Sequence, residues 1–192
     1  DPTSSYAQAA AMAMGRAMDD VIIAAATGTA YTGETGATSE SVQTAIAASV
    51  GTGTGLNLVK LTTAKRLLDD ADVDPSIPRH IIVGPEQLQN LLAVEQVTSS
   101  DYNTVKALVQ GEIDSYLGFK FTVSNRLAKS GNDRTCIVYA EDGITLGIGK
   151  DISARIDERA DKSYATQVYY CQSIGATRME SAKVVPITCT EA

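Results

Sequence analysis

The sequence has no tryptophan, two phenylalanines and one histidine, His80, among 192 residues. Its cores must therefore be mainly aliphatic, because large aromatic side chains otherwise supply much of the buried area of a domain. A catalytic triad or a cysteine–histidine pair would have to use His80, and no nucleophile motif points to it. We interpret His80 as a polar residue at the start of an apolar strand.

Paired cysteines and long apolar runs are also missing. Cys136, Cys171 and Cys189 are isolated and form no CxxC pair, which argues against a zinc site and against a disulfide scaffold. We expect all three to be reduced and buried. No apolar run approaches the roughly 18 residues that a membrane-spanning helix needs, and no signal-peptide or lipidation motif is present, so we expect no membrane partner.

Basic residues are fewer than acidic ones. The formal net charge is -7, and an acidic chain repels a phosphate backbone, which excludes a dedicated nucleic-acid binder. No Walker motif, nucleophile elbow or metal-binding pair occurs, so we expect no enzyme, no cofactor and no metal. The GTGTG run at Gly51–Gly55 lacks a third spaced glycine or a Gly-Lys-Ser/Thr, and we interpret it as a flexible connection. A small-molecule enzyme built around this run and the carboxylates of Asp69–Asp74 is a remote alternative.

The first element present is a long helix from Thr3 to Ala26, around which the rest of the chain is organised. Apolar residues recur there at steps of three and four, which is the spacing of one helical face; they are Tyr6, Ala10, Met14, Ala17, Val21 and Ala25. Serine and threonine precede the stripe as N-cap candidates, and Gly28 follows it as a C-terminal candidate. We interpret the helix as a structural spine.

Shorter elements follow in the middle of the chain. The patterns predict helices at 56–72, 86–93 and 99–109, strands at 79–83, 119–124 and 134–139, and a short apolar segment at 144–148. The segment 39–50 fits a helix or a strand. At the end, Ser163–Ala176 alternates as a long strand, and we expect Val184–Cys189 to return beside it as a hairpin that lies on the first helix. Because Pro186 has no amide donor, this last strand is expected at a sheet edge.

These elements predict an α+β fold with two bodies. We expect residues 1–50 and 147–192 to form one domain, the long helix packed on the C-terminal strands, and 51–146 to form an inserted α/β domain. Charges of both signs alternate densely over residues 155–162, which is typical of a salt-bridged surface. We take this cluster as the candidate contact between subunits: Arg155, Asp157, Glu158, Arg159, Asp161 and Lys162.

Several blocks resemble the major capsid proteins of tailed bacteriophages. They are VTSSDYNTVKALVQGEIDSYLGFKF at 97–121, GPEQLQNLL before it, ISARIDERADKSYATQVYYCQSIGATRME near the end, and the passage of the alanine-rich helix into GTAYTGETG. The blocks are collinear over nearly the whole chain. The resemblance implies the Hong Kong-97-type fold, with a peripheral domain of spine helix and long β-sheet and an axial domain of mixed α/β structure.

The same resemblance implies a function. It predicts a shell protein that self-assembles through pentamers and hexamers into an icosahedral head, works with portal and scaffolding proteins, and contacts the packaged DNA only non-specifically. It would assemble in the bacterial host cytoplasm and reside in the virion. The alternative on the same fold is an encapsulin-like bacterial nanocompartment shell.

One departure from the family pattern bears on assembly. The chain begins at Asp1-Pro2, and the N-terminal arm and extended loop that precede the spine helix in the family are missing from it. We therefore expect a processed or truncated chain that assembles poorly by itself, and we assign no crosslinking residue.

Overall fold

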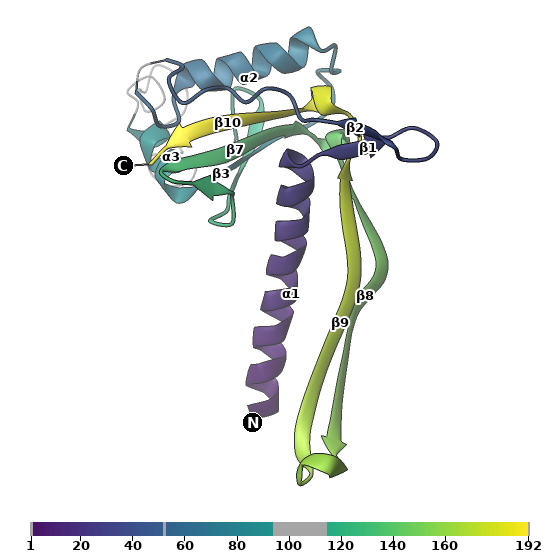
Figure 1. The fold of residues 1–192 in the computed structure, drawn as a ribbon. Coiled ribbons are helices and arrows are strands. Elements are labelled where there is room, and N and C mark those ends of the chain that lie inside the picture. Colours follow the sequence, from purple (N-terminus) through teal and green to yellow (C-terminus); the bar gives the residue numbers. More distant parts are fainter. Residues whose placement is uncertain (1, 52, 94–114, 192) are drawn as a thin grey trace.

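The structure, a computed structural model, describes residues 2–51, 53–93 and 115–191. A six-stranded sheet forms one body, and a long helix beside a long two-stranded hairpin forms the other (Figure 1). The predicted α+β composition is therefore confirmed. The helices are α1 (Pro2–Thr27), α2 (Leu58–Asp70) and α3 (Pro85–Leu92). The strands are β1 (Ala30–Thr32), β2 (Thr38–Glu40), β3 (Arg79–Val83), β4 (Ser115–Tyr116), β5 (Phe119–Val123), β6 (Lys129–Ser130), β7 (Asp133–Ala140), β8 (Ile144–Arg159), β9 (Ala165–Arg178) and β10 (Val184–Thr190).

The six-stranded sheet has the order β10-β7-β3-β5-β4, with β6 paired to β7. β3 and β5 are parallel, and the other pairs are antiparallel. Helix α2 lies on one side of the sheet and the C-terminal end of α1 approaches from the other (Figure 1). Because both faces of this sheet are covered, the sequences of β3 and β7 are nearly continuous apolar runs and do not alternate between apolar and polar residues. The predicted helix at 99–109 lies outside the described residues.

Helix α1 extends over 26 residues, or about 39 Å at 1.5 Å per residue. The predicted stripe from Ala10 to Ala25 is half-buried, whereas Tyr6 is 68% exposed. Among the residues of α1 with described side chains, full burial is confined to Ile23 and Ala26, near the sheet. The helix therefore enters the main core only at its last turns, and its N-terminal half is covered on one side by the hairpin.

The hairpin consists of β8 and β9, paired from Ile144↔Arg178 to Arg159↔Ala165. The prediction that Val184–Cys189 pairs with the 163–176 strand is wrong: that segment is β10, and it pairs with β7 at the edge of the six-stranded sheet. The predicted apolar segment at 144–148 is only the beginning of β8. Gly147, Gly149 and two register shifts interrupt the apolar alternation there, so the rest of the strand reads as a charged surface run.

The edge position of Pro186 is confirmed. Its carbonyl accepts a hydrogen bond from the Ile46 amide at 2.9 Å, on the side of β10 that faces away from β7. Since the N and C=O of one strand residue point to the same side, the missing amide removes no bond of the β10–β7 ladder. Around Ile46, residues 41–50 run mostly without regular structure, so neither the helix nor the strand considered for 39–50 forms beyond β2.

Arg178, at the end of β9, ties the hairpin to the C-terminal end of α1 and to β2. Its side chain donates to the carbonyls of Ala26 at 3.2 Å and Gly28 at 2.7 Å, at the C-terminus of α1, and to the carbonyl of Glu40 at 2.8 Å. A cation at this end also suits the helix dipole. Burial lowers the pKa of the guanidinium, which is 3% exposed, so this contact carries a desolvation cost. One side chain thus holds α1, the hairpin and β2 together.

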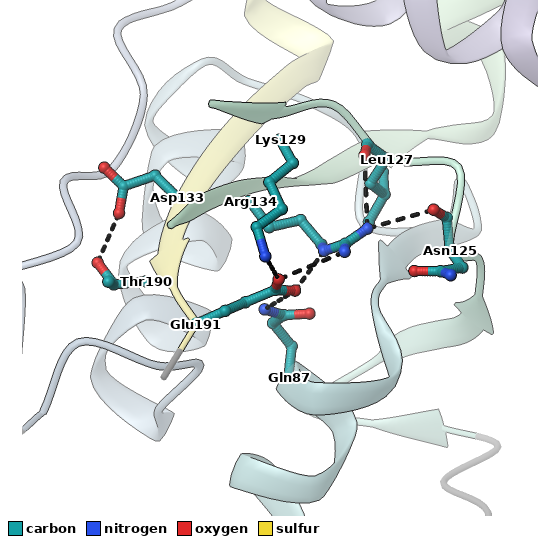
Figure 2. A network of polar contacts seen from close by, with 8 residues as sticks. All are labelled: Gln87, Asn125, Leu127, Lys129, Asp133, Arg134, Thr190 and Glu191. Atoms are coloured by element: carbon teal, nitrogen blue, oxygen red, sulfur yellow. Dashed lines mark hydrogen bonds and ion pairs between the residues drawn. The ribbon is translucent and has the colours of Figure 1, made fainter. Parts of the chain in front are cut away.

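A second polar network holds the end of the chain against the sheet, as Figure 2 shows. The buried carboxylate of Glu191 accepts hydrogen bonds from Arg134, from Lys129 at 2.5 Å and from Gln87 at 3.2 Å. The hydrogen bond from Arg134, followed by that from Lys129, lowers the pKa of Glu191 to about 2. The network ties β10 to β6, β7 and α3.

Candidate assembly surface

The β8–β9 hairpin has one face toward α1 and one away from it. Gln172 donates to the carbonyl of Met14 at 3.4 Å and Arg178 caps the helix, so the even-numbered residues of β9 face α1. The odd-numbered residues, among them Tyr169 and Cys171, face away. Directly paired residues of neighbouring strands share a face, which places the β8 partners of Tyr169 and Cys171 on the outer face as well.

The structure divides the predicted contact cluster between faces. Arg155 is paired with Tyr169 on the outer face, and Asp157 and Arg159 lie on the same face; Glu158 points to the other side. Asp161 and Lys162 lie in the 3-10 turn η3 (Ala160–Lys162) at the hairpin tip. All six side chains are exposed.

Only part of the expected salt-bridging occurs. Arg159 donates from Nε to Asp161 Oδ1 at 2.9 Å, and this hydrogen bond lowers the pKa of the aspartate. Within the described ranges, Arg155, Asp157, Glu158 and Lys162 form no ion pair. Most of the cluster is therefore free to pair with charges of another molecule.

Large apolar side chains accompany these charges. Tyr169 and Ile156 are each 51% exposed, on opposite faces of the hairpin, and Tyr164 at the tip is 71% exposed. Ile156 is paired with Val168, so it lies on the side of α1. It belongs to β8, however, and the helix lies closer to β9 (Figure 1). Exposed aromatic and aliphatic groups beside unpaired charges are typical of contact surfaces. The alternation along Ser163–Ala176 separates two faces of the strand, but the exposure of Tyr169 could not be inferred without knowing that β8 is the partner strand.

Cys171 does not share the environment of the other cysteines. Cys136 and Cys189 are buried in the six-stranded sheet, as predicted, but Cys171 is only half-buried, so its predicted burial is wrong. Its sulfur lies 3.0 Å from Lys150 Nζ and 3.0 Å from Ser153 Oγ. Cys171 is only half-buried because α1 covers one face of the hairpin and Cys171 lies on the other face.

The residues of the enzyme alternative have structural partners. In the GTGTG run, Lys60 Nζ donates to the carbonyls of Thr54 at 2.9 Å and Gly55 at 2.7 Å, so this part of the connection is pinned rather than flexible. In the carboxylate cluster, Asp69 forms an ion pair with Arg79 at 2.7 Å. His80 stacks on Tyr139 with ring centroids 5.4 Å apart. Among the residues described, no group of three or more histidine, cysteine or acidic side chains is arranged to hold a metal ion.

None of the described helices has the length and apolar character needed to cross a membrane.

The fold is the one found in phage capsids. A chain of Mycobacterium phage Che8 matches with a TM-score of 0.67 and 20% identity over 96% of this chain and 62% of that chain. The capsid of cyanophage P-SCSP1u matches with 0.70 and 16% over 100% and 67%, and that of cyanophage Pam1 with 0.71 and 14% over 100% and 70%. The chain thus spans about two thirds of the length of these capsid chains.

A family model, that of phage capsid proteins, matches residues 1–191. The chain therefore belongs to the phage capsid protein family, and the predicted resemblance is confirmed. No curated protein matches it. The nanocompartment alternative gains no support, because the matching family is the phage one.

Proposed function

We propose that this chain is the shell-forming part of a major capsid protein that self-assembles into an icosahedral head around a phage genome. Membership of the phage capsid family over residues 1–191 carries the proposal, together with a hairpin on which Arg155, Asp157, Glu158 and Lys162 form no ion pair with the described residues. Identical chains close into a finite shell through repeated symmetric contacts. Each contact can be weak, because a subunit held by several neighbours gains avidity.

In this proposal α1 is the spine helix, and it forms the peripheral domain together with β8 and β9. The six-stranded sheet with α2 and α3 is the axial domain, clustered around fivefold and sixfold centres. The boundaries proposed from the sequence, 1–50 with 147–192 and 51–146, are kept with one change: β10 goes to the axial unit, because it pairs with β7.

The outer face of the hairpin, with Arg155, Asp157 and Arg159, is the proposed contact between subunits. Glu158 and the tip residues Asp161 and Lys162 would extend it. Arginine and tyrosine side chains such as Arg155 and Tyr169 are enriched where protein surfaces meet. We also propose a non-enzymatic role, partnership with portal and scaffolding proteins, and assembly in the host cytoplasm. The net charge of -7 would keep contacts with packaged DNA weak and non-specific.

The test is charge reversal in the full-length protein. Arg155→Glu with Arg159→Glu should abolish or sharply reduce shells in electron micrographs of the sized protein, while circular dichroism shows a folded chain. Lys65→Glu with Lys120→Glu is the matched control: it changes the net charge equally at two exposed positions of the six-stranded body. Normal shells from the Arg155/Arg159 variant would refute the assigned contact, and equal loss in both variants would show that only net charge matters.

A further inference from the structure

Cys171 lies between two polar side chains from the neighbouring strand. Its Sγ is 3.0 Å from Nζ of Lys150 and 3.0 Å from Oγ of Ser153, both on β8. Lys150, Ser153 and Tyr169 also line an open hollow of about 600 Å³ on the outer face of the hairpin. A small molecule dissolved in water can therefore reach the partners of this thiol.

Two irregularities in β8 produce the arrangement. The pairing shifts between Ile148 and Lys150 and again between Lys150 and Ser153. Residues three apart in a regular strand point to opposite faces. The extra residue between Lys150 and Ser153 instead brings both side chains onto the face of Cys171, because Lys150 pairs with Ser173 and Ser153 with Cys171. β-Bulges often change the direction in which a side chain points.

The surroundings favour the reactive form of the thiol. Hydrogen bonds from Ser153 and Lys150 lower the pKa of the Cys171 thiol to about 7, so a large fraction is thiolate at neutral pH. The thiolate is the species that attacks an oxidant. Cys136 differs, because its hydrogen bond to Cys189 and its burial raise the pKa of its thiol.

We propose that Lys150 and Cys171 form an oxidative crosslink, a sulfenamide between Nζ and Sγ that joins β8 to β9. The distance between the two atoms and their common face carry this inference. The bond would form where the register shifts interrupt the strand pairing, and it would reinforce the hairpin at that point. It does not depend on the shell-forming role.

The oxidant is a peroxide, and the chemistry has two steps. The Cys171 thiolate attacks one peroxide oxygen and the O–O bond breaks. With hydrogen peroxide the departing hydroxide takes a proton from the Lys150 ammonium, so the products are a sulfenic acid, a water and a neutral Lys150 amine. Neutral Lys150 Nζ then attacks the sulfenic sulfur, hydroxide leaves with the S–O electron pair, and the nitrogen loses a proton to it. One peroxide is reduced to two waters overall, and the protein loses two hydrogens.

The test is mass spectrometry of the full chain after treatment with hydrogen peroxide. We expect an intact mass lower by two hydrogens, a linked pair of peptides containing Lys150 and Cys171, and reversal by a thiol reductant. Cys171→Ser should lose the product. Lys150→Arg keeps a cation beside the thiol but has no nucleophilic amine, so its Cys171 should instead be labelled by a cyclic 1,3-diketone that traps sulfenic acids.

Lys162→Arg is the matched control, an exposed lysine at the tip of the same hairpin, and it should crosslink like the unmodified chain. The proposal is overturned if the unmodified chain gives only oxygen-containing products or a Cys171-linked dimer, or if Lys150→Arg still loses two hydrogens.

Discussion

Replacing Arg178 by methionine should destabilise the fold more than any other single change of a charged residue along the hairpin. Three carbonyls, those of Ala26, Gly28 and Glu40, would lose a charged donor that now lies within 3.2 Å. Hydrogen bonds to charged groups contribute about 1.5–3 kcal/mol each. The desolvation of the guanidinium offsets part of the sum, and such terms are not additive, so we expect a net loss of about 4 kcal/mol.

Urea unfolding followed by far-ultraviolet circular dichroism would measure this loss. Arg178→Lys should keep a cation but reach fewer of the carbonyls, so its loss should be intermediate. Arg126→Met is the control: it removes an exposed ion pair between Arg126 and Asp20 of α1, and its unfolding midpoint should hardly move. A loss below about 1 kcal/mol for Arg178→Met would refute the reasoning, because it would mean that other donors satisfy those carbonyls.

Three further predictions concern the six-stranded body. In the folded chain the pKa of Glu191 is about 2, against an ordinary 4.5. The stabilisation from this carboxylate is therefore present above pH 4.5 and is lost as the pH falls toward 2. Over that window the melting temperature of Glu191→Gln should change less with pH than that of the unmodified chain. Lys60→Met should lower the free energy of unfolding, measured in urea, by about 3 kcal/mol, because the buried ammonium donates hydrogen bonds to carbonyls of the GTGTG run and of Thr188. An unchanged unfolding midpoint would contradict this. Gly84→Ala would place a Cβ 2.3 Å from Gln87 Oε1 and 2.9 Å from Arg134 Cδ, so we expect a loss of about 1–3 kcal/mol, measured by thermal unfolding, and a neutral effect would show that the two side chains can move aside.

Local patterns predicted the elements that carry a regular apolar stripe or a continuous apolar run. Helix α1 follows from the spacing of its apolar residues, and its observed range, Pro2–Thr27, differs from the expected Thr3–Ala26 by one residue at each end. Strand β3 agrees with its prediction at both ends, because RHIIV is apolar and bounded by Pro78 and Gly84. In both cases the neighbouring turn or cap residues mark the limits.

The pairing of the last strands was not predictable in the same way. β9 and β10 both read as strands, but nothing local specifies a partner, and sequential strands are neighbours often enough to suggest a hairpin. The true partner of β9 is β8, whose middle contains Gly149, Asp151 and two register shifts. A strand that buries little apolar surface carries little of the alternating signal on which prediction depends.

The candidate contact surface could not be predicted from the sequence for the same reason. Alternation along Ser163–Ala176 separates two faces of a strand, but it cannot say which face another element covers. Here α1 covers the face of Gln172, and the face of Tyr169 and Cys171 remains open together with Arg155. For an isolated domain such a face would be an aggregation hazard, because two-stranded hairpins have little independent stability and unpaired edges. In a member of the phage capsid family the same exposure has a reason, since the remaining cover can come from another copy of the chain. The observation that supports the proposed contact surface is therefore the second, uncovered face of a strand, and this face could be recognised only once the partner of that strand was known.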